Sequence, residues 1–348
     1  MNQLKNHTAH LLNHQPLPEA AMTEAMEIIM TGGTDPVSIA AFLTALRMKG
    51  ETVAELTAAA RVLRARALPL PVSFSDALDT CGTGGDGGTT FNVSTAAALV
   101  AAAGGVKVMK HGNRAVSSRC GSADVLEALG IAIHQQPEAA RQALETVGMT
   151  FLFAPDYHQS MKQVAGVRKT LGFRTIFNLL GPLANPGRPV YQVLGVYDRR
   201  LVTPMAQVLQ QLGIQRGLVV HGSDGMDELT LTGTSYLCEV TPETLTSSSL
   251  EPEAVGLKRC DAEVLIGGDT AFNAKVIEGA FSNQRPEAAD LIALNAGAAL
   301  YVAGKAATLA TGVFQAKQLI QNGSAAAKLA DLRSYEAAPG GFREAASC

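Results

Sequence analysis

Residues 79–95 read DTCGTGGDGGTTFNVST, and this stretch decides the fold because five glycines fall between an apolar strand candidate and a helix candidate of small residues. A helix N-terminus presents unpaired N–H groups, which suit a phosphate, and glycines let the backbone approach its oxygens. The pattern is neither GxxxxGK[ST] nor GxGxxG. A flexible linker is the alternative, but the order strand, glycine loop, helix favours an anion cradle.

The pattern of alternating strands and helices continues after residue 76. Strands are predicted at 77–81, 105–110, 130–134, 149–154, 191–198 and 216–222, and helices at 94–104, 122–130, 137–148, 157–172 and 201–212. This alternation indicates an α/β domain with a mostly parallel central sheet flanked by helices. Residues 228–241 have the period of an antiparallel hairpin at the sheet edge, and 241–256 are loop-like. The last 80 residues are Ala-rich and helical, with a frayed tail at 338–348.

The first 70 residues carry helix signals only, which predicts a small all-helical N-terminal domain. Asp35 is a natural N-cap, Pro36 suits the first helical position, and Gly50 marks the end of that helix. Thr52 and Glu55 form a capping box for the next helix, which ends near Ala67. We therefore expect a helical domain at 1–72 and an α/β domain at 73–348.

Composition excludes several classes of protein. The 348 residues are 47% hydrophobic and 17% charged, with a net charge of -3, so no global attraction to nucleic acid or to an anionic membrane is expected. The five cysteines, at 81, 120, 238, 260 and 348, show no CxxC spacing. They fit a reducing compartment better than a disulfide framework or a zinc site. With no signal-peptide pattern and no span-length apolar run, a cytoplasmic protein is expected.

A second candidate loop is cationic. Five basic or imidazole side chains fall within thirteen residues, interleaved with Ser117, Ser118 and Ser122. They are Lys107, Lys110, His111, Arg114 and Arg119. Ligands of doubly wound sheets bind outside the carboxyl ends of the strands, where both loops are expected. An ordinary solvated basic loop is the alternative, and the pairing with the glycine loop favours polyanion capture.

A third segment places carboxylates after a predicted strand. Asp224, Asp227 and Glu228 are hard oxygen ligands of the kind that Mg²⁺ accepts while it bridges a phosphate. A turn with helix-capping acids is the alternative interpretation.

Together these segments resemble the anthranilate phosphoribosyltransferase family. The resemblance rests on GTGGDGGTTFNVST, KHGNRAVSSRCGSADVLEALG, HQSMKQVAGVRKTLGFRTIFNLLGPLANP and DGMDE, in that order, and runs from about residue 10 to about residue 335. It implies transfer of phosphoribose from 5-phosphoribosyl 1-pyrophosphate to the amine of anthranilate, with Mg²⁺, in tryptophan biosynthesis. It also implies a homodimer joined through the helical domain, which takes in helices from about 158–185.

The resemblance also implies roles for particular residues. The donor-binding residues are Gly82, Gly85, Asp86, Thr90, Asn92, Val93, Ser94, Thr95, Lys110, His111, Gly112, Asn113, Arg114, Ala115, Val116, Ser117, Ser118 and Ser122. Gly82, Asn113 and Arg168 are assigned to anthranilate, although a solvated helix face is the alternative for Arg168. Ser94, Asp227 and Glu228 are assigned to the metal. No general base is assigned. His111 assisting proton transfer and His111 holding backbone or substrate both remain open.

Two rivals are less consistent with these residues. A pyrimidine nucleoside phosphorylase of the same architecture would carry a lysine-led loop of the form KHSTGGVGD, whereas Asp79, Thr80 and Cys81 lead the loop here. A non-catalytic relative that binds nucleic acid or a metabolite would show a basic surface and eroded loops. This chain is mildly acidic and its loops are intact.

Overall fold

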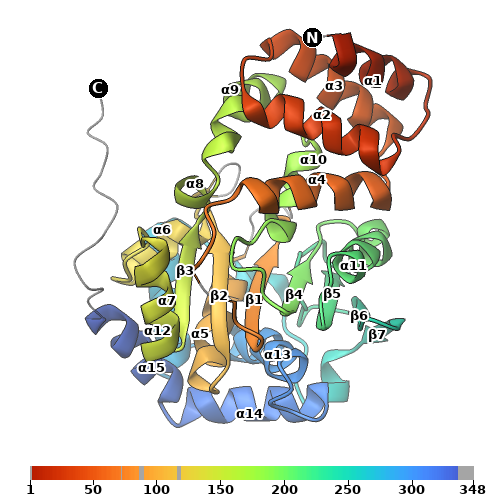
Figure 1. Ribbon diagram of the computed structural model, residues 1–348. Coiled ribbons are helices and arrows are strands. Elements are labelled where there is room, and N and C mark those ends of the chain that lie inside the picture. Colours follow the sequence, from red (N-terminus) through yellow and green to blue (C-terminus); the bar gives the residue numbers. More distant parts are fainter. Residues whose placement is uncertain (1, 72, 86–89, 116–118, 336–348) are drawn as a thin grey trace.

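The computed structural model describes residues 2–71, 73–85, 90–115 and 119–335, and it begins with a helical unit (Figure 1). Its helices are α1 (Asn2–Leu12), α2 (Glu19–Thr31), α3 (Pro36–Lys49) and α4 (Val53–Arg66). The predicted caps are confirmed, because the Asp35 side chain accepts hydrogen bonds from the first turn of α3 and Thr52 and Glu55 form the capping box of α4. Each satisfied cap stabilises its helix by about 1 kcal/mol.

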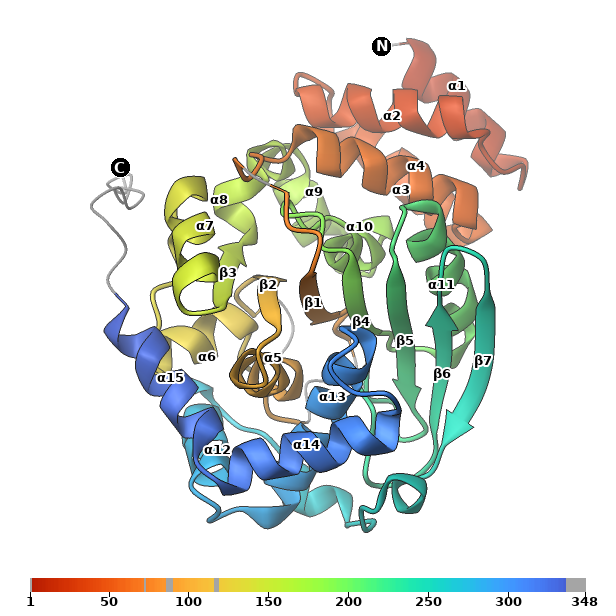
Figure 2. The same ribbon diagram turned by 60° about the horizontal axis from the view of Figure 1, so that its bottom comes forward.

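The second unit is built on one sheet, and the described residues form seven strands in it. They are β1 (Ala77–Gly82), β2 (Lys107–Gly112), β3 (Met149–Phe153), β4 (Tyr191–Gly195), β5 (Arg216–Gly222), β6 (Ser235–Val240) and β7 (Leu245–Leu250). Their order is β3-β2-β1-β4-β5-β6-β7 (Figure 2). The first five in this order are parallel, and β6 and β7 continue the sheet antiparallel. The predicted fold class is therefore confirmed.

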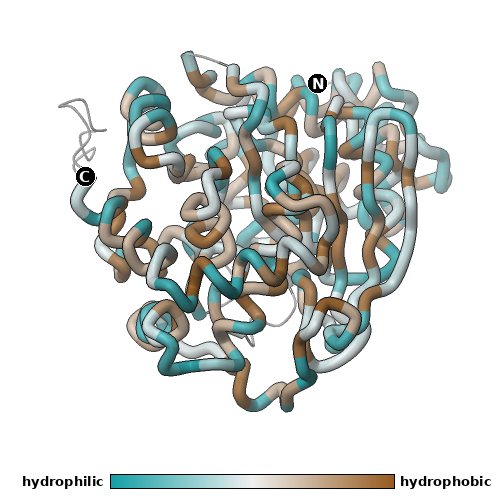
Figure 3. The backbone as a smooth tube through the Cα atoms, turned by 90° about the horizontal axis from the view of Figure 1, so that it is seen from below, coloured by the Kyte–Doolittle hydropathy of each residue, from teal (hydrophilic) through white to brown (hydrophobic). Residues whose placement is uncertain are grey.

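Helices cover both faces of the sheet. The helices of the described chain after α4 are α5 (Val93–Ala103), α6 (Ser122–Ala128), α7 (Pro137–Thr146), α8 (Ala154–Tyr157), α9 (Lys162–Leu171), α10 (Ile176–Leu180), α11 (Val202–Gln211), α12 (Thr270–Phe281), α13 (Pro286–Val302), α14 (Leu309–Gln321) and α15 (Ser324–Ser334), of which all but α9 and α10 surround the sheet. One apolar core joins α5, α6 and α12–α15 to one face, while α7, α8 and α11 cover the other. The outer helices alternate hydrophobic and hydrophilic residues along their length, as surface helices do (Figure 3).

Two helices from the middle of the chain pack against the N-terminal helices. Val164 and Val167 of α9 and Ile176 and Phe177 of α10 belong to the same apolar cluster as the buried residues of α1–α4. The segment 158–180 therefore lies against the helical unit (Figure 1).

The sequence predictions for two segments were wrong, for different reasons. Residues 131–136 form no strand, although Ile131 and Ile133 are buried, because they run between α6 and α7 without a ladder partner. The edge hairpin is shifted along the chain: 228–234 is a turn region, and β7 lies in the stretch predicted as loop. β7 is an exposed edge strand of Ser and Thr, so it lacks the apolar alternation that marks half-buried strands. The predicted tail at 338–348 lies outside the described residues.

Candidate active site at the carboxyl ends of the parallel strands

The ends of β1 and β4 are shaped around Asp227. Gly82 and Gly195 are paired in register, and a Cβ on either would overlap Asp227, at its carboxylate and at its backbone carbonyl respectively. The buried Asp227 carboxylate accepts a hydrogen bond from the N–H of Gly84 at 2.7 Å. Thr83 bonds to the end of β4 through its N–H, which donates to Gly195 O at 3.0 Å. The loop after β5 is thus locked to the start of the glycine loop.

Glu228 lies at the start of α5. Its Oε1 accepts a hydrogen bond from the N–H of Ser94 at 3.1 Å, so a carboxylate occupies the helix N-terminus, where the helix dipole favours negative charge. Lys110 on β2 is buried and donates from Nζ to Thr80 O. Burial lowers the pKa of Lys110, while the negative charges of Asp79, Glu228 and Asp227 oppose that shift. One buried cation is therefore held beside two loop carboxylates.

The second loop is organised by Asp124 of α6. Its carboxylate accepts hydrogen bonds from the N–H groups of Ala115 at 2.9 Å and Gly121 at 2.8 Å. It also pairs with Arg114 at 3.0 Å, and Arg114 makes a further ion pair with Glu127 at 2.5 Å. Partial burial acts in the opposite direction, but these donors hold the pKa of Asp124 below its usual range. Arg114 is therefore already neutralised by protein carboxylates.

Asn92 connects the two loops. Its amide donates to Cys120 O at 3.1 Å and its carbonyl accepts from Asn273 of α12 at 3.1 Å. Thr90 forms an isolated antiparallel bridge with Ile266, so the described end of the glycine loop also rests on the segment before α12. The ends of both loops are held at fixed positions around the same space.

A pair of buried histidines lies beside β2. The rings of His111 and His158 are 5.1 Å apart, and in the described structure neither Nε2 has a hydrogen-bond partner. Burial lowers the pKa of His158 to about 4. Burial and the neighbouring His158 hold the pKa of His111 well below its usual range. Both rings are neutral at neutral pH, and each offers an unused nitrogen.

Two arginines extend from the α9–α10 segment. Arg168 is half-buried with its guanidinium 5.6 Å from the centre of the Phe177 ring, and no carboxylate in the described part of the chain pairs with it. Arg174 donates to Gly85 O and lies 4.0 Å over the Tyr197 ring. The first is an unpaired cation near the helical unit, and the second connects that segment to the glycine loop.

The structure brings most of the sequence-predicted site residues to one edge of the sheet. The described ones are Gly82, Gly85, Thr90, Asn92, Val93, Ser94, Thr95, Lys110, His111, Gly112, Asn113, Arg114, Ala115, Ser122, Asp227 and Glu228. Asp86, Val116, Ser117 and Ser118 lie outside the described residues. Lys107 does not join them, because it stands at the opposite end of β2, where it pairs with Asp76 at 3.1 Å.

Sequence reasoning did not single out three residues that contact this site. Arg174, His158 and Asn273 all sit on elements far in sequence from the loops they contact. A local pattern carries no sign of such contacts. The only available signal was that Arg174 and His158 lie within a segment already used for the family resemblance.

The donor set fits a Mg²⁺ ion that is completed by a substrate. Asp227, Glu228 and Ser94 line one small cavity and supply only carboxylate and hydroxyl oxygens. Among the described residues no group of three His, Cys, Asp or Glu side chains forms a self-sufficient metal site. Mg²⁺ is characteristically held by one or two carboxylates together with substrate phosphates. The residues present therefore fit that ion in that setting.

Two further observations concern the cysteines and the helices. The described cysteines, at 81, 120, 238 and 260, are free thiols. No helix within the described ranges is long and apolar enough to cross a bilayer.

Comparison with known protein families shows the class of protein to which this chain belongs. Residues 5–67 match the helical bundle domain of the glycosyl transferase family, and residues 75–326 match its α/β domain. The fold and the two loops thus define a glycosyltransferase with a helical bundle beside an α/β unit.

Individual proteins that are similar to this chain show which family of glycosyltransferases it belongs to. The chain is 50% identical to the anthranilate phosphoribosyltransferase of Brevibacillus brevis over 91% of this chain and 93% of that protein. It is 49% identical to that of Geobacter sulfurreducens, over 94% and 98%. The crystal structure of the Thermus thermophilus enzyme superposes with a TM-score of 0.89 at 45% identity, covering 94% of this chain and 98% of that one. The Saccharomyces cerevisiae enzyme in complex with PRPP and Mg superposes with a TM-score of 0.84 at 27% identity, covering 95% and 98%. The chain belongs to the anthranilate phosphoribosyltransferase family.

Proposed function

We propose that this chain transfers 5-phosphoribose from 5-phosphoribosyl 1-pyrophosphate to the amine of anthranilate, giving N-(5-phosphoribosyl)anthranilate and pyrophosphate, in tryptophan biosynthesis. The observation that carries this proposal is that two loops lie side by side, each between the carboxyl end of a parallel strand and the start of a helix. The chain also has 50% sequence identity to an anthranilate phosphoribosyltransferase. A donor with a 5′-phosphate and a pyrophosphate needs two anion sites, and two loops of this kind supply them.

The donor occupies the space between the two loops. It is bound by Gly82, Gly85, Asp86, Thr90, Asn92, Val93, Ser94 and Thr95 from the first loop and by residues 110–118 and Ser122 from the second. The buried Thr95 hydroxyl has no hydrogen-bond partner among the described residues, which supports this assignment because buried polar groups without a partner are uncommon. Arg114 acts mainly through its ion pairs with Asp124 and Glu127, which keep the second loop in shape.

Ser94, Asp227 and Glu228 hold Mg²⁺ together with the donor's pyrophosphate. When bound, the ion neutralises charge on the leaving pyrophosphate. The chain's own part is to place the two carboxylates, and it does so through the N–H groups of Gly84 and Ser94 and through the absence of side chains at Gly82 and Gly195.

Anthranilate is an aromatic carboxylate, and its site needs a cation beside apolar surface. Arg168 binds the carboxylate, with Gly82 and Asn113 nearby, because its guanidinium is half-buried without a protein counter-ion in the described structure. The Nε2 atoms of His111 and His158 are buried and have no hydrogen-bond partner in the described structure, and their neutral rings add no charge beside the site.

The chemistry needs little proton transfer from the protein. The anthranilate amine is already unprotonated at neutral pH, and departure of pyrophosphate from C1 leaves positive character on the ribose. Catalysis is then mainly positioning and electrostatic stabilisation of the leaving group. The low pKa of His111 makes it a weak base, so it serves to orient a ligand rather than to remove a proton.

The histidine pair predicts a pH dependence of stability. His158 has a pKa of about 4 when folded and about 6.5 when unfolded, so between these values the unfolded chain binds more protons and stability falls as pH falls. The loss from this residue amounts to roughly 3 kcal/mol between pH 7 and pH 4. Urea unfolding of wild type and His158→Gln at pH 7.5 and pH 5 measures it, and we expect the variant to lose less stability on acidification. His134→Gln, at an exposed histidine, is the control, and an unchanged pH slope in His158→Gln would refute the assignment.

From the contacts of Arg174 we expect that its loss raises the KM for the phosphoribosyl donor and leaves the KM for anthranilate unchanged. Arg174→Met removes the hydrogen bond to Gly85 O and the packing on Tyr197, so the glycine loop loses its connection to the α9–α10 segment. We expect the KM for the donor to rise about tenfold, the size of one charge-assisted hydrogen bond. Arg199→Met is the matched control, because Arg199 also lies over a tyrosine ring, that of Tyr236. Steady-state kinetics with an unchanged donor KM would contradict this role.

Three features of assembly and location belong to the same proposal. The helical domain is discontinuous: residues 1–72 are joined by helices from about 158–185, and the other residues of 73–348 form the α/β domain that binds the phosphoribosyl donor. The shared apolar cluster of α1–α4, α9 and α10 supports this. The chain forms a homodimer through the helical domain, in support of which Leu12, Val37 and Met48 on α1 and α3 are 64–76% exposed. The enzyme acts in the cytoplasm, with small-molecule substrates and no nucleic acid or membrane partner.

Mixing the protein with anthranilate, 5-phosphoribosyl 1-pyrophosphate and Mg²⁺ tests the function. Anthranilate fluorescence is expected to fall with time, and pyrophosphate is expected to accumulate in equal amount. Folded protein that leaves the fluorescence unchanged would refute the proposed reaction.

A further inference from the structure

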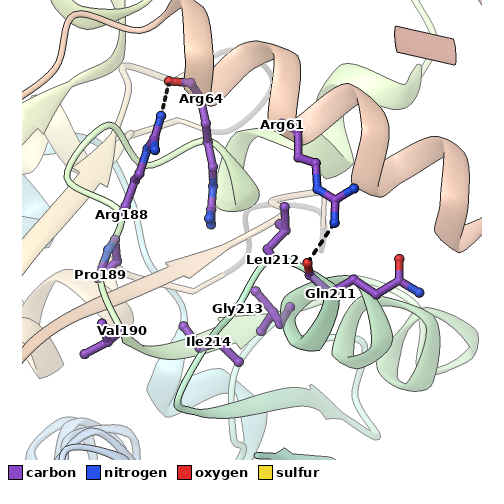
Figure 4. Close-up of a pocket in the computed structure, with 10 residues that line it drawn as sticks. Arg61, Arg64, Arg188, Pro189, Val190, Gln211, Leu212, Gly213 and Ile214 are labelled. Carbon is purple, nitrogen blue, oxygen red and sulfur yellow. Dashed lines mark hydrogen bonds between the residues drawn. The ribbon is translucent and has the colours of Figure 1, made fainter. Parts of the chain in front are cut away.

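A pocket separate from the active site lies between α4 and the opposite edge of the sheet. It measures about 320 Å³ and is lined by residues from α4, from the chain before β4, from the end of α11 and from the chain that joins α11 to β5 (Figure 4). These residues are Arg61, Arg64, Arg188, Pro189, Val190, Leu209, Gln211, Leu212, Gly213 and Ile214. Because Val190 and Ile214 come just before β4 and β5, the pocket is at the amino ends of these strands, whereas the active site is at the carboxyl ends.

The lining is electrostatically unbalanced. Among the described residues that line the pocket there are three arginines and no aspartate or glutamate. Arg61 is paired, with Glu19 outside the lining and with Gln211 O at 3.1 Å. No ion pair involves Arg64 or Arg188 in the part of the chain that the structure describes. Two guanidinium groups thus share one pocket in which no described carboxylate is within ion-pair distance of either, although the charge of Asp79 acts on Arg64 from farther away.

The two unpaired arginines are held in place by backbone contacts. Arg64 donates from Nε to Leu183 O at 2.6 Å. Arg188 donates to Arg64 O at 3.3 Å (Figure 4). Within the described structure the terminal nitrogens of Arg64 have no hydrogen-bond partner. Arg188 has a φ of 47°, a left-handed conformation that a residue with a Cβ rarely adopts. Burial and the like charge of Arg188 lower the pKa of Arg64 to about 10.

Apart from Gln211 and Gly213, the other lining residues are apolar. Pro189, Leu209 and Ile214 are buried, and Val190 and Leu212 are half-buried. A guanidinium binds a carboxylate through two parallel hydrogen bonds, and small-molecule pockets combine apolar walls with a few placed polar groups. The chemistry therefore matches an anion with an apolar body better than a bare inorganic ion.

We propose that this pocket is a binding site for a small organic carboxylate, held by Arg64 and Arg188 at its charged end and by the half-buried Val190 and Leu212 along its apolar body. The bound molecule bridges α4 of the helical unit and the α11–β5 segment of the α/β unit. The proposal is independent of the reaction proposed above.

A ligand-observed NMR titration with 3-phenylpropionate tests the site. Wild type and Arg168→Ala are expected to bind it alike, which separates this pocket from the anthranilate site. The double variant Arg64→Gln/Arg188→Gln removes both guanidinium groups of the proposed site and is expected to bind about tenfold more weakly, because the charge-assisted contacts are lost. Arg200→Gln/Arg259→Gln, which removes the same charge from exposed positions elsewhere, is expected to bind like wild type.

Two further ligands define the chemistry. The uncharged 3-phenylpropionamide is expected to bind at least about tenfold more weakly than the acid, since it lacks the anionic group. Inorganic phosphate is expected to bind more weakly than 3-phenylpropionate. Absence of binding to wild type, equal binding to the arginine double variant, equal binding of the amide, or tighter binding of phosphate would each overturn the proposal.

Discussion

Arg168→Ala is expected to raise the KM for anthranilate by about 10- to 100-fold and to leave the KM for the phosphoribosyl donor nearly unchanged. The reason is that the guanidinium is half-buried, rests against Phe177 and pairs with no carboxylate in the described structure. A charge-assisted, partly desolvated contact of this kind contributes about 1.5–3 kcal/mol to binding.

Steady-state kinetics with each substrate varied in turn makes the measurement. Lys169→Ala is the matched control, because Lys169 is the exposed neighbour on the same helix and is expected to leave both constants unchanged. An equal rise in the KM values of both substrates in Arg168→Ala would show that the residue acts on the fold or on both sites, and would contradict its assignment to anthranilate.

Asp227→Asn combined with Glu228→Gln is expected to lower kcat/KM by at least about 100-fold and to move the Mg²⁺ titration of activity to higher concentrations. Both carboxylates line the cavity beside Ser94, and loss of their charge removes the protein's part of the metal site. Amides keep the shape and retain an acceptor for the N–H groups of Gly84 and Ser94, so the loop contacts survive.

The control for this pair is Asp261→Asn, at an exposed carboxylate before the segment that meets Thr90. It is expected to leave the Mg²⁺ titration unchanged. If the double variant titrates with Mg²⁺ as wild type does, Asp227 and Glu228 serve only as caps of the loop and of α5.

The sequence was most informative where local chemistry determines structure. Asp35, Pro36 and the Thr52–Glu55 box specify helix starts by contacts within one turn, and they are where they were predicted. The same holds for the glycine loop after β1, because the strand before it and the helix after it both have strong local patterns.

Contacts between distant segments could not be predicted in this way. The requirement for glycine at 195 arises from Asp227, 32 positions away in the chain, and the link from Arg174 to Gly85 spans 89 positions. β7 carries no apolar alternation because only its backbone is needed at the sheet edge. In the sequence, Lys107 counted toward the cationic cluster. In the structure it is the first residue of β2, so the length of that strand separates it from the loop that follows Gly112.

The most direct test of the central claim is a crystal structure of the protein with 5-phosphoribosyl 1-pyrophosphate and Mn²⁺ in place of Mg²⁺, using the anomalous signal of the metal. The account predicts a pyrophosphate between the loops that follow β1 and β2, with the metal peak beside Asp227 and Glu228. A donor bound elsewhere, or a metal remote from both carboxylates, would contradict it.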